Sequence, residues 1–179
     1  MLSRTYLCVH APSSSIMMPS SGAILNSVKD AMAEVVAIFE SATREILFIV
    51  PPSVLSIAGT SFNTVADAKH FKQNGGVMRG ITTISRANAE ETQMRLDLGE
   101  DLRHSDLRYE IFMIVGDRQH SLSAMYADVK EFTLDTPIVA FKCDSPIYAE
   151  YLIAAFEKVW SEAVPAEERL RELLEQGPL

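Results

Sequence analysis

Residues 110–117 read EIFMIVGD, an apolar run that ends at a glycine and an aspartate. A continuous apolar run of this length, bounded by turn-forming residues, is typical of a buried central strand. Residues 45–50, EILFIV, form a second such run, which ends at Pro51 and Pro52 because proline cannot donate to a sheet. Residues 77–84 follow two glycines and add another strand. The sequence therefore predicts a sheet organised around residues 110–117.

Helices are predicted between and beside these strands. Over residues 23–41 apolar side chains recur at steps of three and four, which indicates an amphipathic helix with Ser20 or Ser21 as its N-cap. A helix over residues 63–73 joins two strands, and this order predicts a right-handed parallel crossover. The other predicted elements are a helical turn at 53–59, helices at 87–99, from 146 and at 165–176, and strands at 119–126 and 136–142. The whole order predicts an α/β domain with a mostly parallel mixed sheet and helices on both faces.

Composition excludes several classes of protein. The 179 residues are enough for one domain, and 47% apolar with 22% charged residues is ordinary for a globular chain. A net charge of −8 without a cluster of basic residues argues against a nucleic-acid partner. Cys8 and Cys143 are too few and too far apart for a metal site or a disulfide framework. We therefore expect a cytoplasmic protein with no membrane partner, no metal and no cofactor.

The chain divides into three predicted parts. Residues 1–21 contain SSS and PSSG and are expected to form a flexible leader, since their apolar patch at residues 6–9 is too short for a signal peptide. Residues 22–164 form the α/β domain. Residues 165–179 form a C-terminal helix with a narrow leucine stripe.

The spacing around the central strand resembles that of the phospholipase D superfamily, in which the motif HxKxxxxD lies on such a strand. Glu110 and Phe112 stand at the His and Lys positions, and Asp117 matches the Asp. The resemblance extends over residues 36–177. It includes the first strand at residues 45–52, a GV-x-R second strand at residues 76–79, a segment at residues 84–104 similar to sensor domains of archaeal and bacterial histidine kinases and TrmB-type regulators, and a helical exit at residues 156–169. It implies one half of a phospholipase D-like fold, without the nucleophile and the phosphate-binding cation of that superfamily.

A ligand-binding site is predicted at Arg79, Arg103, His104, Glu110 and Asp117. The predicted topology brings these residues toward one edge of the sheet, where open α/β folds bind ligands. Two arginines and a histidine are able to hold a carboxylate or a phosphate. As surface residues or ion pairs beside strands, the same side chains would have no ligand.

Because the His and Lys of the motif are replaced, the sequence predicts a non-catalytic sensory or regulatory domain and not an enzyme. It would act in signal transduction and transcription regulation through protein contacts, a small anionic ligand and a separate output protein. Two alternatives stay open: a phosphodiesterase-like hydrolase that uses His104 or His120 with Asp117, and a structural dimerisation module without a ligand. Since the chain holds one half of the fold, we expect a homodimer through residues 23–41 or 148–159.

Overall fold

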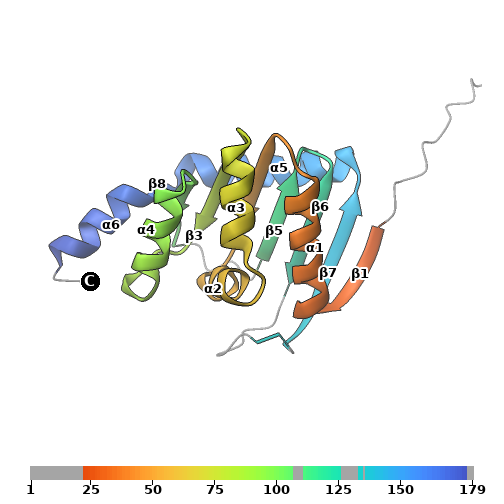
Figure 1. The fold of residues 1–179 in the computed structure, drawn as a ribbon, viewed down its shortest axis with the longest axis horizontal. Coiled ribbons are helices and arrows are strands. Elements are labelled where there is room, and N and C mark those ends of the chain that lie inside the picture. Colours follow the sequence, from red (N-terminus) through yellow and green to blue (C-terminus); the bar gives the residue numbers. More distant parts are fainter. Residues whose placement is uncertain (1–21, 107–110, 126–132, 135, 177–179) are drawn as a thin grey trace, which may run out of the picture.

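The computed structural model describes residues 22–106, 111–125, 133–134 and 136–176, so the predicted leader lies outside the described residues. The first half of the chain contains most of the helices, and the second half contains most of the strands (Figure 1). The elements are β1 (Gly22–Ser27), α1 (Val28–Ser41), β2 (Glu45–Ile49), α2 (Pro52–Ser61), α3 (Thr64–Gln73), β3 (Val77–Thr82), η1 (Arg86–Asn88), α4 (Ala89–Asp97), β4 (Asp101–His104), β5 (Ile111–Gly116), β6 (His120–Met125), β7 (Pro137–Asp144), α5 (Pro146–Glu162), β8 (Val164–Pro165) and α6 (Ala166–Glu175).

The strands form one mixed sheet in the order β1-β7-β6-β5-β2-β3-β4-β8. The predicted α/β class, with a mixed sheet and helices on both faces, is confirmed. The pairs β2–β3 and β3–β4 are parallel, as the predicted crossover requires. The remaining pairs are antiparallel, so parallel pairing is less frequent than predicted. The reason is that β5, β6 and β7 follow one another without an intervening helix, and only a long crossover can join parallel neighbours.

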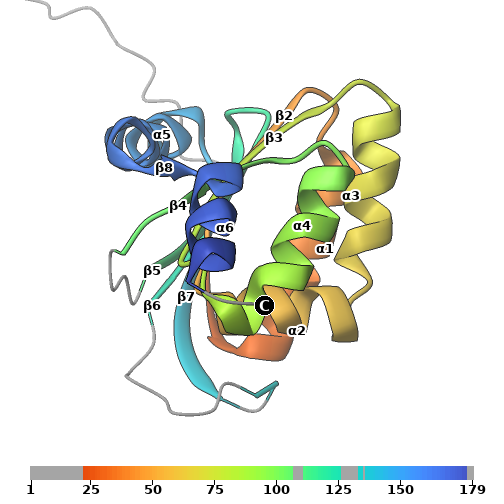
Figure 2. The same ribbon diagram turned by 90° about the vertical axis from the view of Figure 1, so that its left-hand side faces the viewer.

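The sheet separates two hydrophobic cores of unequal size. Helices α1 to α4 cover one face, and α5 lies alone on the other (Figure 2). The larger core joins α1 to α4 and α6 to their face of the sheet, and Ala166, Leu170 and Leu173 anchor α6 in it. The smaller core joins α5 to β2, β3 and β5 through Phe156 and Trp160. Among the described residues, no helix has the length and apolar character needed to cross a membrane.

The first helix begins later than predicted. Residues 22–27 form strand β1, and α1 begins at Val28 with Ser27 as its N-cap, whose hydroxyl accepts a hydrogen bond from the Asp30 amide at 3.1 Å. Pairing with β7 satisfies the backbone groups on one side of β1, which is enough to hold these residues as an edge strand. Leu25 still packs against the same core as Val28. The apolar spacing therefore continues from the strand into the helix and imitates one long helix.

Candidate functional site

Asp117, the residue that matches the superfamily motif, holds the start of β2 in place. Its carboxylate accepts hydrogen bonds from the amides of Thr43, Arg44 and Glu45 at 2.8 to 2.9 Å and from the Thr43 hydroxyl at 3.0 Å. Burial alone would raise the pKa of Asp117, but these hydrogen bonds outweigh it and hold the pKa below its ordinary value. The carboxylate is therefore engaged by the protein's own backbone.

Arg79 and Arg103 meet at one aromatic ring. Their guanidinium carbons lie 5.4 and 4.4 Å from the centroid of Trp160, which is favourable for cation–π contacts. Arg79 also binds Glu157 at 2.7 Å and Glu45 at 3.2 Å, and Arg103 donates to the Trp160 carbonyl at 2.9 Å. Burial lowers the pKa of Arg79, but the two carboxylates outweigh it, so the net shift is upward. An anion at this place would have to compete with both glutamates.

His104 lies on the opposite face of β4 from Arg103, because successive strand residues alternate between faces. Its Nδ1 accepts a hydrogen bond from the Ile84 amide at 2.9 Å, so Nε2 carries the proton and donates to Asp106 at 3.1 Å. Burial lowers the pKa of His104, although Asp106 acts in the opposite direction. A neutral histidine that is bonded at both nitrogens supports the loop after β3.

The predicted ligand site is therefore divided among several places. Arg79 and Arg103 both contact Trp160 on one face of the sheet, whereas His104 points to the other face. Asp117 lies at the end of the sheet where β2 begins. His104 lies at the opposite end, where β3 and β4 end. Glu110 lies outside the described residues. In the described part of the chain, neither His104 nor His120 contacts Asp117. Ligand binding by the five residues remains a prediction.

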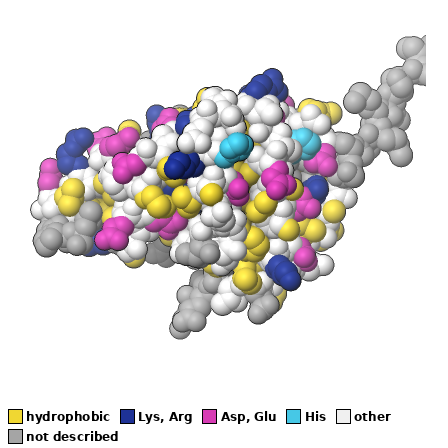
Figure 3. Space-filling model, in the orientation of Figure 1, with side chains coloured by type: hydrophobic (Ala, Val, Ile, Leu, Met, Phe, Trp, Pro, Cys, Tyr) yellow, Lys and Arg dark blue, Asp and Glu magenta, His cyan; other side chains and the backbone are white. Residues whose placement is uncertain are grey.

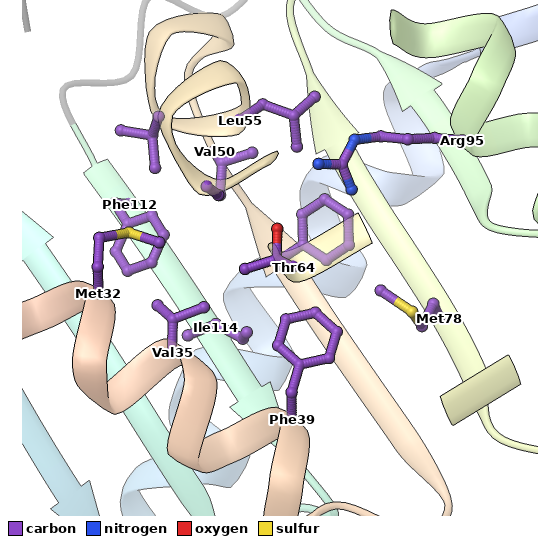
Figure 4. A pocket seen from close by; sticks show the side chains of 13 residues that line it. Met32, Val35, Phe39, Val50, Leu55, Thr64, Met78, Arg95, Phe112 and Ile114 are labelled. Carbon is purple, nitrogen blue, oxygen red and sulfur yellow. The ribbon is translucent and has the colours of Figure 1, made fainter. Parts of the chain in front are cut away.

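Phe112, at the lysine position of the motif, is buried and points into a small apolar cavity between α1, α2 and the sheet (Figure 4). The cavity has a volume of about 30 Å³, which is room for one or two water molecules. Thr64 Oγ1 on its wall has no hydrogen-bond partner among the described residues, while Arg95 is paired with Glu100 at 3.2 Å. This space is too small for a substrate, and Phe112 brings no charge to it.

A larger, polar groove lies on the α1 side, where β6 begins and β7 ends. It has a volume of about 220 Å³ and is lined by Glu34, Ala37, Ile38, Ser41, His120, Ser121, Lys142 and Asp144. His120 and Asp144 are cross-strand partners, and His120 Nδ1 lies 3.0 Å from Asp144 Oδ1. The side chain of His120 is 35% exposed, so its ring reaches the solvent in the groove.

Lys142 provides the groove with a cation. Its Nζ lies 2.6 Å from Glu34 Oε2 on α1, and this hydrogen bond raises the pKa of Lys142.

Ser121 is no free nucleophile, because its hydroxyl donates to the Cys143 carbonyl at 2.8 Å. Within the described ranges, no cluster of three or more His, Cys, Asp or Glu side chains is arranged to hold a metal. Around the groove, acidic and basic side chains are interspersed over the face that carries α1, α3 and α4 (Figure 3).

Sequence reasoning found His120 but missed its partners. Lys142 is the last residue of the strand predicted at residues 136–142, and Asp144 lies between that strand and the helix predicted from residue 146. A usable signal was present, because Lys142 and Asp144 are two residues apart and must share one face of β7. The register of β6 on β7, which places Asp144 opposite His120, depends on the connection between them and cannot be read from either strand alone.

Comparison with known proteins identifies the fold. No family model matches the sequence, and no curated protein is significantly similar to it. The chain matches TrmBL2, an archaeal chromatin protein whose structure shows a novel mode of DNA binding, at a TM-score of 0.62 and 13% identity, over 85% of this chain and 56% of TrmBL2. It matches Nuc, a phospholipase D family member from Salmonella typhimurium, at a TM-score of 0.57 and 14% identity, over 81% of this chain and 98% of Nuc. NucT from Helicobacter pylori matches at a TM-score of 0.62 and 13% identity, with the same coverages of 81% and 98%.

These matches contradict the prediction that the chain is not an enzyme. That prediction depended on Glu110 and Phe112 at the His and Lys positions of the motif, and the loss of one site does not exclude chemistry elsewhere in a fold. The chain spans about half of TrmBL2 but 98% of Nuc, a member of an enzyme family. At identities of 13 to 14% the matches establish the architecture alone. The chain therefore has a phospholipase D-like α/β fold.

Proposed function

We propose that the chain is a hydrolase of phosphate diesters and that its active site is the groove between α1 and the adjoining ends of β6 and β7. The observation that carries this proposal is the His120–Asp144 pair, which opens into the groove beside Lys142. The histidine is one that the sequence had already singled out for a hydrolase. Its acidic partner is Asp144 in place of Asp117, whose carboxylate is occupied at the start of β2.

His120 supplies the base. When Nδ1–H donates to Asp144, the Nε2 lone pair is available to the groove, and no hydrogen bond occupies Nε2 within the described part of the chain. The carboxylate fixes the tautomer and stabilises the imidazolium that forms on proton uptake. A water molecule on Nε2 loses its proton to His120 as its oxygen bonds to phosphorus. The bond from phosphorus to the leaving alcohol breaks on the opposite side of the phosphorus, where the departing oxygen takes a proton from solvent water, and the imidazolium of His120 returns its proton to the solvent.

Lys142 supplies the cation that a phosphoryl group needs, and the charges around it decide which ester fits. Glu34 and Asp144 are negative and Lys142 is positive, so with His120 neutral the groove carries a net charge of −1. A dianionic monoester would meet stronger repulsion there than a monoanionic diester. A phosphate oxygen has to share Lys142 with Glu34, whose carboxylate is 2.6 Å away.

The test is turnover of bis(p-nitrophenyl) phosphate by the full chain and by His120→Ala. General-base catalysis contributes about 100-fold to 10,000-fold to a rate, so we expect a loss of that size in His120→Ala. The matched control is His70→Ala, because His70 is an exposed histidine on α3 outside the groove. Lys142→Ala should raise KM more for the diester than for a neutral carboxylate ester. Turnover that persists in His120→Ala, or its absence in the wild type, would overturn the proposal.

A regulatory role through protein contacts is a second candidate function. It is favoured by the likeness in fold to TrmBL2, an archaeal chromatin protein. Such a role would use the predicted anion site at Arg79 and Arg103, and an anion that binds the native state alone at about 100 times its Kd adds about 2.7 kcal/mol of stability. A thermal-shift screen of carboxylates and phosphates tests this, with Arg103→Ala as the variant that must lose the shift. A shift of equal size in Arg103→Ala would count against the site.

A further inference from the structure

The groove between α1 and the adjoining ends of β6 and β7 is small, and its size limits the ester that it can hold. Its volume is about 220 Å³, whereas pockets for drug-sized ligands have volumes of about 300–1,000 Å³. At about 30 Å³ for each water-sized group, the groove takes about seven such groups. A phosphate with one short alcohol fits this space, but a nucleoside or a long acyl chain would extend far outside it.

The walls of the groove lack the side chains that recognise nucleic acids and lipids. Among its described lining residues none is Phe, Tyr or Trp, so a base finds no ring on which to stack. Lys142 is the one cation among them and the whole chain carries −8, whereas a protein that follows a phosphate backbone presents several cations. Ala37 and Ile38 form the apolar part of the lining, which is too little to cover a lipid chain.

The charged groups of the groove lie in a definite order. Lys142 and Asp144 are two residues apart on β7, so they share a face and are separated by about 6–7 Å along the strand. His120 is bonded to Asp144, and Glu34 Oε2 contacts Lys142 Nζ at 2.6 Å. A phosphate with one oxygen on Lys142 therefore has the attacking water on its His120 side, and Glu34 stands beside the oxygen that Lys142 binds.

This order decides which alcohol of the ester meets Glu34. In an in-line displacement the attacking and leaving oxygens lie opposite each other, so the alcohol that stays on phosphorus is equatorial, like the oxygen on Lys142. Glu34 is thus a neighbour of the retained alcohol. An ionised carboxylate only accepts hydrogen bonds, so it favours an alcohol with a further hydroxyl. An ammonium group at this place would be repelled by Lys142.

We propose that the substrates are small phosphate diesters of polyhydroxy alcohols, and that Glu34 sets this preference by accepting a hydrogen bond from a hydroxyl of the retained alcohol. The inference rests on the proposed function of the groove. Glu34 Oε1 is the oxygen for this role, because Oε2 is held by Lys142. Glu34 moves no proton in the reaction: water adds to phosphorus, the other alcohol leaves, and the polyol remains as its phosphate monoester.

The experiment compares kcat/KM for three p-nitrophenyl phosphate diesters in which the retained alcohol is propyl, 3-hydroxypropyl or thymidine 5′. All three release p-nitrophenol, so the leaving group is constant. The first two differ by a single hydroxyl, which lies too far along the chain for ready attack on its own phosphorus. We expect the wild type to prefer the 3-hydroxypropyl ester over the propyl ester about 10-fold, as a hydrogen bond to a charged group gives, and to turn over the thymidine ester most slowly.

Glu34→Ala should abolish the preference for the hydroxyl. The propyl ester should be turned over at least as well as by the wild type, because its phosphate no longer shares Lys142 with a carboxylate. The 3-hydroxypropyl ester should fall to the level of the propyl ester. Damage to the fold would lower both values together, so the ratio separates recognition from stability. The matched control is Glu40→Ala, since Glu40 is an exposed glutamate of α1 outside the groove, and its ratio should equal that of the wild type.

Glu34→Gln is a second variant that keeps the shape of the side chain and removes its charge, and it should reduce the ratio severalfold. Three results would overturn the inference and leave the hydrolase in place. They are equal kcat/KM for the propyl and 3-hydroxypropyl esters in the wild type, a preference that persists in both Glu34 variants, and a thymidine ester that is the best substrate. Absence of turnover of all three esters would overturn the proposed function, and this inference with it.

Discussion

Removing the Asp117 carboxylate tests whether this one side chain fastens the β5–β6 turn to the start of β2. Asp117 and Arg118 have φ values of 50° and 59°, in the left-handed region. The Gln119 amide closes their turn by donating to the Gly116 carbonyl at 3.1 Å. Asp117→Gly keeps this backbone conformation without strain and removes the carboxylate, whereas Asp117→Asn keeps one acceptor oxygen and removes the charge.

The magnitude follows from the four hydrogen bonds that Asp117 accepts. They are largely solvent-exposed, so the freed amides regain water, and each bond contributes about 0.5–1 kcal/mol. Asp117→Gly should therefore lower the free energy of unfolding by about 2–4 kcal/mol, and Asp117→Asn by about half of that. For a domain of this size the larger loss lowers Tm by at least about 4 °C.

The assay is urea denaturation at several pH values. The folded pKa of Asp117 lies below the ordinary value of 3.8, so the unfolded state binds more protons in this range. The stabilisation is complete above about pH 5 and is lost as the pH falls through the folded pKa. The difference between wild type and Asp117→Asn should shrink in the same range. Variants that unfold within about 0.5 kcal/mol of wild type at neutral pH would refute the reasoning.

Three further substitutions test close packing and a buried ion pair. In Gly80→Ala the new Cβ would lie 2.2 Å from the Phe48 ring, so we expect a loss of at least about 1–3 kcal/mol in urea denaturation. Gly75→Ala meets open space at a φ of 86° and should cost about 1–2 kcal/mol, from backbone strain alone. Equal losses would contradict the clash. Glu100→Gln removes the charged partner of Arg95, whose side chain is 3% exposed, and should cost about 3–5 kcal/mol in the same assay. A loss below about 1 kcal/mol would mean that Glu91 alone compensates the guanidinium.

Local patterns predicted the elements that are bounded by prolines or glycines. Pro51 and Pro52 end β2 near the predicted residue, and Gly75 with Gly76 follows α3. The pairing of strands was harder, because an apolar run such as β5 has the same composition whether its neighbours run parallel or antiparallel. The strand β1 was missed for a related reason. Its stability comes from β7, more than a hundred residues later in the chain, and no local signal reveals that contact.

The candidate site was predicted in part. His120 was identified by its chemistry, but Asp144 and Lys142 acquire meaning only when β7 is placed beside β6 and α1. Arg79 and Arg103 both lie against Trp160, and the sequence did not show that Trp160 and Glu157 would stand between these arginines and any ligand. Asp117 was predicted as part of the ligand-binding site, and in the structure its carboxylate fastens the β5–β6 turn to the start of β2.

Trp160 is the single tryptophan of the chain, and it is 9% exposed on the side of α5 that faces the sheet. Because two guanidinium groups lie against its indole, separation of α5 from β3 and β4 removes both cations from the fluorophore at once. Its emission spectrum is thus a built-in reporter of the α5 layer alone. Followed beside far-ultraviolet circular dichroism, which averages over every helix, it shows whether that layer detaches before the rest of the molecule unfolds.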